Sequence, residues 1–197
     1  MDFGEVLRRR KAVRNYSGEP VPHETLERIV ARGRRVPSGG FSQGLRLVVV
    51  TDQATRSAIA ELADEEEEYV KAGFEPWISR APAHIVIATR EEDYRERYRQ
   101  PDKLLEDGSE IDWPVPYWHV DAGAAMMLLM LAAVDEGLAA GVFGVLDWRP
   151  IWELLGIPDD VLPVAIVTVG KPAPEIRRGS RKRGWKPLDE VVRWHRW

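Results

Sequence analysis

The chain has 197 residues, which suits a single domain, and 44% of them are hydrophobic, which is enough to build a core. Its formal net charge of −4 argues against a protein that coats nucleic acid, and the lack of cysteine excludes disulfides, thiolate nucleophiles and cysteine-bound metals. The four histidines include no pair at the i, i+4 spacing of a helical metal site, so we expect no metal.

Periodicity and turn residues divide the chain into helices and strands. Helices are expected where apolar residues recur every three or four positions, and strands where short β-branched runs lie between turn residues. In chain order, the predicted elements are a helix over residues 2–10, a helix from about Pro22 to before Pro37, a strand over 45–51, a helix over 53–69, a strand over 85–89, a helix over 122–134, a short helix over 150–155 and a strand over 164–169.

Three of these segments carry expectations about burial. The strand over 45–51 is almost wholly apolar, which is typical of a strand buried on both faces. The acidic run over 64–68 is interpreted as a solvated helix face. Residues 122–134 are apolar on every side, which predicts a central helix buried all round. We therefore expect an α+β sandwich around one mixed or antiparallel sheet.

No membrane segment is expected. The apolar stretch over residues 122–134 is shorter than the roughly 20 residues that span a bilayer. The first residues of the chain are charged where a signal peptide needs an apolar run. We therefore expect a cytoplasmic protein.

The segment over about residues 90–120 begins with a highly charged stretch without clear periodicity, long for a loop in a compact domain. Within a single domain over residues 1–197, we interpret it as a lid or as an excursion across a partner. Residues 175–197 are interpreted as a C-terminal extension. The candidate lid or substrate residues in the segment are Trp113, Tyr117 and Trp118. The alternative is that these rings only cap the apolar helix that follows.

Residues 40–44, Gly-Phe-Ser-Gln-Gly, match the G-x-S-x-G pattern of a hydrolase nucleophile elbow. That chemistry needs a strand before the serine and a helix after it. Here a predicted helix precedes the loop and a predicted strand follows it, so the order argues against an esterase. The chain also lacks the glycine patterns of a dinucleotide fold or a P-loop.

Basic residues gather in two clusters, over residues 8–14 and 177–186. Arg10 and Arg14 lie four residues apart across the end of the first predicted helix. If the two clusters converge, their guanidinium groups would bind a phosphate dianion through paired, charge-assisted hydrogen bonds. The alternative is an ordinary solvated face, and the net charge makes a nucleic-acid patch the weaker hypothesis.

A series of short motifs runs along almost the whole chain. It begins with Arg-Arg-Arg-Lys-Ala-Val-Arg-Asn-Tyr at residues 8–16 and Pro-Ser-Gly at residues 37–39 before a predicted strand. The later pieces are Asp121-Ala-Gly123, Glu136-Gly-Leu138, Phe143-Gly144, Leu155-Gly-Ile-Pro158, Val169-Gly-Lys-Pro172, residues 183–192 and the closing Arg196-Trp197. In this order the set resembles the nitroreductase family, whose usual opening is R-R-S-x-R-x-F/Y followed by P-S-x-x-N-x-Q.

The resemblance implies an α+β fold, an intertwined homodimer, and one FMN per active site built from both subunits. The cofactor-binding residues that it implies are Arg10, Lys11, Ala12, Arg14, Pro37, Ser38, Gly39, Phe143, Gly144, Arg183 and Lys186. The first three would line the phosphate and ribityl chain, and the last two would return to the phosphate. Arg14 would reach the pyrimidine end of the flavin, where a positive charge stabilises the reduced, anionic ring. Residues 37–39 would come from the partner subunit, near the ring, and residues 143–144 would present backbone close to flavin N5.

The resemblance also implies an activity. It is the reduction of an electron-poor small molecule (a nitroaromatic, a quinone or an enone) by ping-pong transfer from NADPH or NADH through FMN, with no catalytic side chain because the flavin carries the chemistry. One alternative is a relative with other flavin chemistry, either flavin fragmentation or reductive dehalogenation. Another is a non-catalytic flavin-binding protein. Two departures motivate the last: Ala12 replaces a common Ser and removes a hydroxyl donor, and Phe41 replaces a common Asn at the expected substrate mouth.

Overall fold

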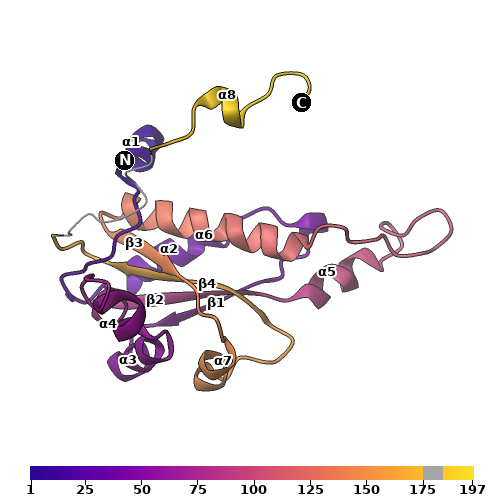
Figure 1. Ribbon diagram of the computed structural model, residues 1–197. Coiled ribbons are helices and arrows are strands. Elements are labelled where there is room, and N and C mark those ends of the chain that lie inside the picture. The colour runs from indigo at the N-terminus through magenta and orange to yellow at the C-terminus, as the bar shows by residue number, and fades with distance from the viewer. Residues whose placement is uncertain (175–183) are drawn as a thin grey trace.

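A four-stranded antiparallel sheet with the strand order β1-β2-β4-β3 forms the centre of the molecule (Figure 1). The computed structural model describes residues 1–174 and 184–197. The strands are β1 (Leu45–Val50), β2 (Ala83–Thr89), β3 (Ala139–Phe143) and β4 (Leu162–Gly170). Together with the helices around it, this sheet confirms the predicted α+β fold.

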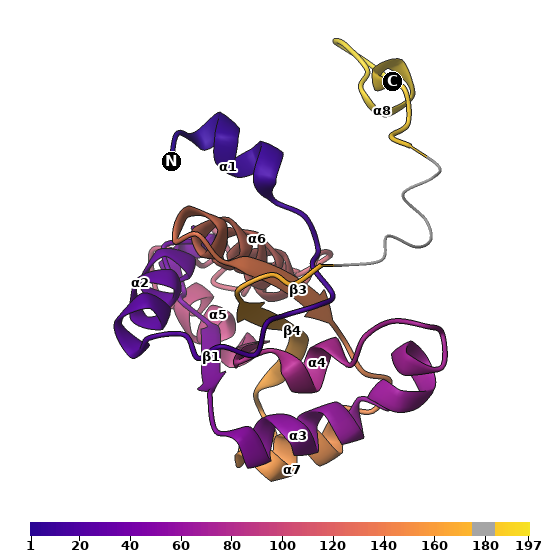
Figure 2. The ribbon, with the colours of Figure 1, turned by 90° about the vertical axis from the view of Figure 1, so that its left-hand side faces the viewer.

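Helices cover both faces of the sheet (Figures 1 and 2). One face carries α2 (His23–Gly33) and the long α6 (Tyr117–Asp135), and the other carries α3 (Gln53–Leu62), α4 (Trp77–Arg80) and α7 (Arg149–Leu155). The alternation of side chains along the strands gives each face its own core. The core beneath α2 and α6 includes Leu26, Ile29, Ile85, Ile87 and Leu129. The core beneath α3, α4 and α7 includes Ile59, Trp77, Val86, Ile151 and Ile166.

Three helices project from this body: α1 (Phe3–Arg9), α5 (Glu91–Tyr98) and α8 (Leu188–Val191). Figure 1 shows α5 at one end of the molecule and α1 near the other, while α8 stands well away from the sheet, beyond α6. Two short turns complete the described elements, η1 (Gly39–Phe41) and the π-helical turn η2 (Glu66–Val70).

The burial predicted for β1 and for the central helix is wrong. β1 is an edge strand that pairs only with β2 among the described strands, so Val49 remains 40% exposed. α6 is buried where it faces the sheet, but Tyr117, Val120 and Met127 on its outer side are 47%, 52% and 40% exposed. An apolar sequence pattern does not show which faces are covered, and the described part of this chain leaves these two faces partly exposed.

α6 is also longer than the predicted helix, with 19 residues. By length and composition it is one helix that could cross a membrane, while 44% of its most apolar window is buried inside the protein. Packing on the sheet and on α2 accounts for the apolar character of its buried side, and the core helix of a globular protein passes the same test.

The helix predicted over residues 53–69 ends early, and the acidic run after it is not wholly a solvated face. α3 ends at Leu62, and Asp64 adopts a positive φ of 49° that breaks the helix. Glu65 is buried because its carboxylate accepts hydrogen bonds from the backbone N–H groups of Ile78 and Ser79 in α4. It therefore satisfies amide groups at the start of that helix that would otherwise lack partners.

Candidate functional site

The chain that follows α1 runs beside β3 and is fixed to it. Ala12 forms a parallel bridge with Ala140, and the Val13 N–H donates to the Ala140 carbonyl at 3.0 Å. Gly141 permits this approach, because a Cβ at that position would lie 2.4 Å from the Val13 carbonyl oxygen. Residues 10–14 and 139–144 therefore lie side by side, and we call them the β3 track.

A basic pocket of about 440 Å³ opens at the start of the β3 track. Its lining residues are Arg8, Arg9, Arg10, Lys11, Val13, Val134, Gly137, Leu138, Ala139 and Pro172, so four are cations and none is acidic. Arg9 pairs with Glu5, whereas Arg10 and Lys11 have no carboxylate within ion-pair distance among the residues that the structure describes. Such a pocket suits an anion with several oxygen atoms. Arg10 and Lys11, two of the residues that the resemblance assigns to the cofactor, both line this pocket, and Ala12 is exposed beside them.

Arg14 lies further along the track, against aromatic rings. Its guanidinium carbon is 5.3 Å from the centre of the Phe74 ring and 5.9 Å from that of Trp77, which are cation–π distances. Trp77 in turn meets the ring of Phe143 edge-on, with centroids 5.7 Å apart. Gly144 follows Phe143 and is exposed. Arg14, Trp77 and Phe143 therefore lie together along the track, and Gly144 lies five strand residues, about 16 Å, beyond Ala139 of the basic pocket.

The loop over residues 37–39 lies at a different pocket, of about 950 Å³, between α2, β1 and the start of α6. Ser38 and Phe41 line it, and no residue lines both pockets. The loop is held by Asp121, whose Oδ2 accepts hydrogen bonds from the Gly39 N–H at 3.1 Å and the Tyr94 hydroxyl at 2.7 Å. Burial and this bond to Asp121 raise the pKa of Tyr94 well above its usual value, so Tyr94 stays a donor. Within one chain, residues 37–39 are thus not at the basic pocket.

The predicted lid rings form one cluster. Trp113 lies between the rings of Tyr98, Tyr117 and Trp118, at centroid distances of 4.7, 6.4 and 5.7 Å. Phe41 is separate from this cluster and is 72% exposed, on a backbone with a positive φ of 59°. Of the four predicted lid or substrate residues, Trp113, Tyr117 and Trp118 are therefore neighbours, and Phe41 lies apart from them on the loop after α2.

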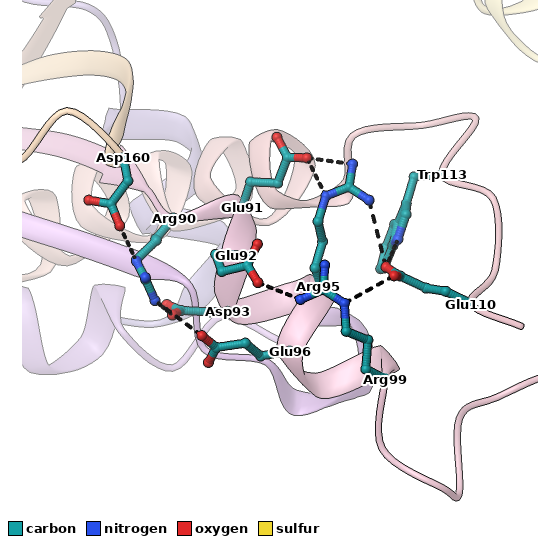
Figure 3. Close-up of polar contacts among 10 residues, drawn as sticks. All are labelled: Arg90, Glu91, Glu92, Asp93, Arg95, Glu96, Arg99, Glu110, Trp113 and Asp160. Atoms are coloured by element: carbon teal, nitrogen blue, oxygen red, sulfur yellow. Dashed lines mark hydrogen bonds and ion pairs between the residues drawn. The ribbon is translucent and has the colours of Figure 1, made fainter.

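The charged stretch before the cluster is more ordered than its sequence suggested, because its charges pair on α5 (Figure 3). Arg95 bonds to Glu91 at 2.6 Å, and Arg99 bonds to Glu92 at 2.5 Å. Both arginines also reach Glu110, at 3.6 and 3.2 Å, and the Trp113 indole N–H donates to the same carboxylate at 3.4 Å. Glu110 therefore ties the loop after α5 to the helix and to the aromatic cluster.

Sequence reasoning missed several residues at these sites. Asp121 was detectable, because it directly precedes the apolar run over residues 122–134, and a carboxylate packed beside such a run needs polar partners. Phe74 and Trp77 gave no such signal, since they meet Arg14 only through the fold.

The remaining predicted cofactor residues are Arg183 and Lys186. Arg183, with most of the second basic cluster, lies outside the described residues. Lys186 is exposed on the segment that leads to α8. Among the described residues, no group of three or more His, Asp or Glu could hold a metal ion.

Comparison with known proteins places this architecture. A sequence model described as "Nitroreductase family" matches residues 7–171. The chain is 29% identical over 168 residues to FMN reductase (NAD(P)H) from Bacillus subtilis strain 168, covering 83% of this chain and 63% of that protein. It is 28% identical over 202 residues to iodotyrosine deiodinase from Nematostella vectensis, covering 97% of this chain and 74% of that protein.

The fold has a close match among solved structures. The crystal structure of a nitroreductase family protein from Streptococcus pneumoniae TIGR4 has a TM-score of 0.74 and 22% identity, covering 98% of this chain and 99% of that chain. The family match spans most of the chain and includes both halves of the β3 track. The chain belongs to the nitroreductase family.

Proposed function

We propose that the chain is an FMN-dependent oxidoreductase of the cytoplasm that takes electrons from NADH or NADPH and passes them to an electron-poor acceptor such as a nitroaromatic, a quinone or an enone. The observation that carries the proposal is the basic pocket at the start of the β3 track. The Bacillus FMN reductase supports the cofactor and the donor by its name, although the chain spans only 63% of that relative's length.

The residues present fit FMN. The pocket volume lies within the range typical of ligand sites, and a phosphate dianion would give Arg10 and Lys11 the anionic partner that they lack among described residues. Ala12 offers no hydroxyl, so phosphate binding rests on the cations, with Arg183 and Lys186 proposed as further contributors. When bound, FMN supplies the hydride and electron transfer.

The other end of the β3 track suits the flavin ring. Arg14 places a cation there, which we assign to the pyrimidine end of the ring. Gly144 is exposed and has no side chain, so its backbone could approach the ring closely, and Phe143 anchors the strand beneath it. On this proposal, Arg14 and Phe143 bind and orient the flavin, and the reaction needs no nucleophilic side chain because the flavin carries the chemistry.

The active protein in this proposal is a homodimer. Tyr117, Val120 and Met127 form an exposed apolar stripe on α6, and monomers rarely leave such patches uncovered. The C-terminal Trp194 and Trp197 are also 77% and 97% exposed. The loop over residues 37–39 lies away from its own basic pocket, so a second subunit would bring Pro37, Ser38 and Gly39 to the flavin of its partner.

We assign the acceptor mouth to Phe41 and to the aromatic cluster around Trp113. Asp121 links the two, because it holds both the loop before Phe41 and the ring of Tyr94. Tyr94 packs edge-on against Trp113, with centroids 6.3 Å apart. On this proposal, residues 90–120 act as a lid, and α5 is held in place by its ion pairs.

A second candidate activity is reductive dehalogenation. It is favoured by the match to iodotyrosine deiodinase, which covers 97% of this chain. Both activities would use the same pocket and track, and they would differ in the molecule that enters the mouth. A flavin-binding protein without turnover is the third candidate, motivated by Ala12 and Phe41.

The visible absorption spectrum of the purified protein, with added FMN and then NADH or NADPH, tests the proposal. A bound flavin band that bleaches with the nicotinamide and returns with a quinone supports the reductase. Release of iodide from 3-iodotyrosine, with no quinone turnover, supports the dehalogenase, and a band that never bleaches supports the binding protein. Protein that takes up no FMN overturns all three.

A further inference from the structure

The Arg14 side chain is held from both ends. At its base, the backbone is fixed to β3 by the hydrogen bond from Val13 to Ala140 and by the close contact of Val13 with Gly141. At its head, the guanidinium lies 5.3 Å from the ring centre of Phe74 and 5.9 Å from that of Trp77. The two supports come from segments about 60 residues apart in the sequence, so their convergence on one side chain is a property of the fold.

The rings around the guanidinium support one another. Tyr69 meets Phe74 edge-on at 6.3 Å and Trp77 edge-on at 5.3 Å. Trp77 is fully buried and abuts Phe143 at the end of β3. Edge-to-face contacts of this kind fix ring orientation. We call these three residues, Tyr69, Phe74 and Trp77, the aromatic brace. They extend from η2 to the first residue of α4, and Trp77 anchors them on the sheet through Phe143.

A guanidinium held in one position stabilises negative charge on a bound flavin ring more effectively than a mobile one. A cation–π contact uses the charge of the guanidinium and does not consume its N–H donors, which remain for hydrogen bonding to a ligand. A cation already in place needs no reorganisation when negative charge develops beside it, and this preorganisation is what makes an electrostatic contact effective. Ring contacts on its guanidinium reduce the number of conformations that this long side chain adopts.

We propose that Phe74 and Trp77 are positioning residues that hold the Arg14 guanidinium at the pyrimidine end of FMN and so favour the reduced over the oxidised flavin. This inference rests on the proposed function. It predicts that substitutions in the brace and substitutions in the basic pocket change different properties of the bound flavin. The brace should act on the redox equilibrium of the bound flavin, whereas the basic pocket at the other end of the β3 track should set the affinity for its phosphate.

The test uses the FMN-loaded protein and the variants Phe74→Leu and Phe74→Tyr. Leu removes the ring and keeps an apolar side chain, whereas Tyr keeps the ring. The readouts are the dissociation constant of oxidised FMN, from flavin fluorescence, and the two-electron reduction potential, from equilibration with a reference dye. We expect Phe74→Leu to weaken binding of reduced relative to oxidised FMN by up to tenfold, a potential lower by about 30 mV. Phe74→Tyr should match the parent.

The double variant decides whether Phe74 acts through Arg14. Arg14→Ala should lower the potential by itself, and adding Phe74→Leu to it should have no further effect. A potential unchanged by Phe74→Leu, or an equal drop in both backgrounds, overturns the brace while leaving FMN binding and the proposed function intact. A parent protein that binds no FMN overturns both. If Phe74→Leu unfolds, Phe74→Met, which keeps more of the bulk, takes its place with the same expected outcome.

Discussion

The imidazole Nε2 of His84 lies 2.8 Å from the carbonyl oxygen of Ile78, inside the core between the sheet and α4. Since a carbonyl only accepts, the ring must donate from Nε2, which leaves Nδ1 as a lone pair without a partner among the described residues. Burial lowers the pKa of His84 from 6.5 to about 4, against the opposing effect of the Ile78 bond. The folded protein therefore holds a neutral histidine at every pH near neutrality.

This histidine predicts a loss of stability in mild acid. Below pH 6.5 the His84 imidazole binds a proton in the unfolded chain, whereas in the folded chain it stays neutral until the pH falls to about 4. The free energy of unfolding should therefore fall by about 3 kcal/mol across that window, and the contribution is fully present above it. In urea unfolding between pH 4 and 7, His84→Gln, whose amide can still donate to Ile78, should flatten the slope. The exposed His23→Gln is the control, and equal slopes in both variants would contradict the assignment.

Arg10 tests the phosphate end of the β3 track. Arg10→Ala should cost roughly 1.5–3 kcal/mol of FMN binding, because one charge-assisted contact is lost. This corresponds to a dissociation constant about 10 to 150 times larger. Arg149→Ala, which removes an exposed arginine from α7, should leave the constant unchanged. Equal affinities for the Arg10 variant and the parent would remove Arg10 from the site.

The parts of the fold that could be predicted are those whose signal is local. β2, β4 and α6 were detectable because their own residues carry the apolar pattern. β3 was missed because Ala-Ala-Gly-Val-Phe has small side chains, and it becomes a strand only by pairing with β4. The sequence of β1 indicates apolar faces but cannot say whether this chain or another covers them.

In the candidate site too, residues with a local sequence signal were predictable, and residues brought together only by the tertiary fold were not. Arg10 and Lys11 were predictable, since their cluster of charge is visible in the sequence. The contact of Phe74 and Trp77 with Arg14 joins residues about 60 positions apart, and neither aromatic residue has a pattern that indicates a cation nearby. The separation of residues 37–39 from their own basic pocket likewise depends on the tertiary arrangement.

The exposed stripe on α6 predicts how the proposed homodimer can be disrupted. Val120→Glu and Met127→Glu place charges on a surface that we expect to be buried between subunits, where an unpaired charge is costly. Sedimentation should show a dimer for the parent and monomers for both variants, with weaker FMN binding because each site loses its partner's loop. Leu62→Glu, on the opposite layer, is the control. A parent that sediments as a monomer would contradict the homodimer.

Phe41 predicts a stabilising substitution. Its backbone has a φ of 59°, which is unfavourable for an aromatic residue, and its ring is 72% exposed, so little burial is lost on replacement. Asn adopts this conformation more readily, and Phe41→Asn should raise the free energy of unfolding by up to about 1 kcal/mol. Phe41→Ala lacks that tolerance and should give no gain. Urea unfolding of the two variants compares them, and a stability no higher for Asn than for Ala would show that the loop is not strained there.

The close packing of residues 10–14 against β3 depends on the absence of a side chain at Gly141. A Cβ there would lie 2.4 Å from the Val13 carbonyl oxygen and 2.8 Å from Thr168 Oγ1, on two different segments. Since the first contact is with backbone, Gly141→Ala must push residues 10–14 away from β3 and lengthen the 3.0 Å hydrogen bond between Val13 and Ala140.

The expected loss for Gly141→Ala is about 1–3 kcal/mol of stability, the usual effect of overpacking. FMN binding should weaken as well, because Arg10, Lys11 and Arg14 all lie on the displaced segment. Gly4→Ala is the matched control, since its added Cβ would meet only the ends of the Asp2 and Arg8 side chains, at 3.3 and 3.4 Å. Thermal unfolding and FMN titration of both variants would measure the two effects. If stability fell while FMN affinity did not, the track would be a structural seam, and the cofactor would have to bind elsewhere.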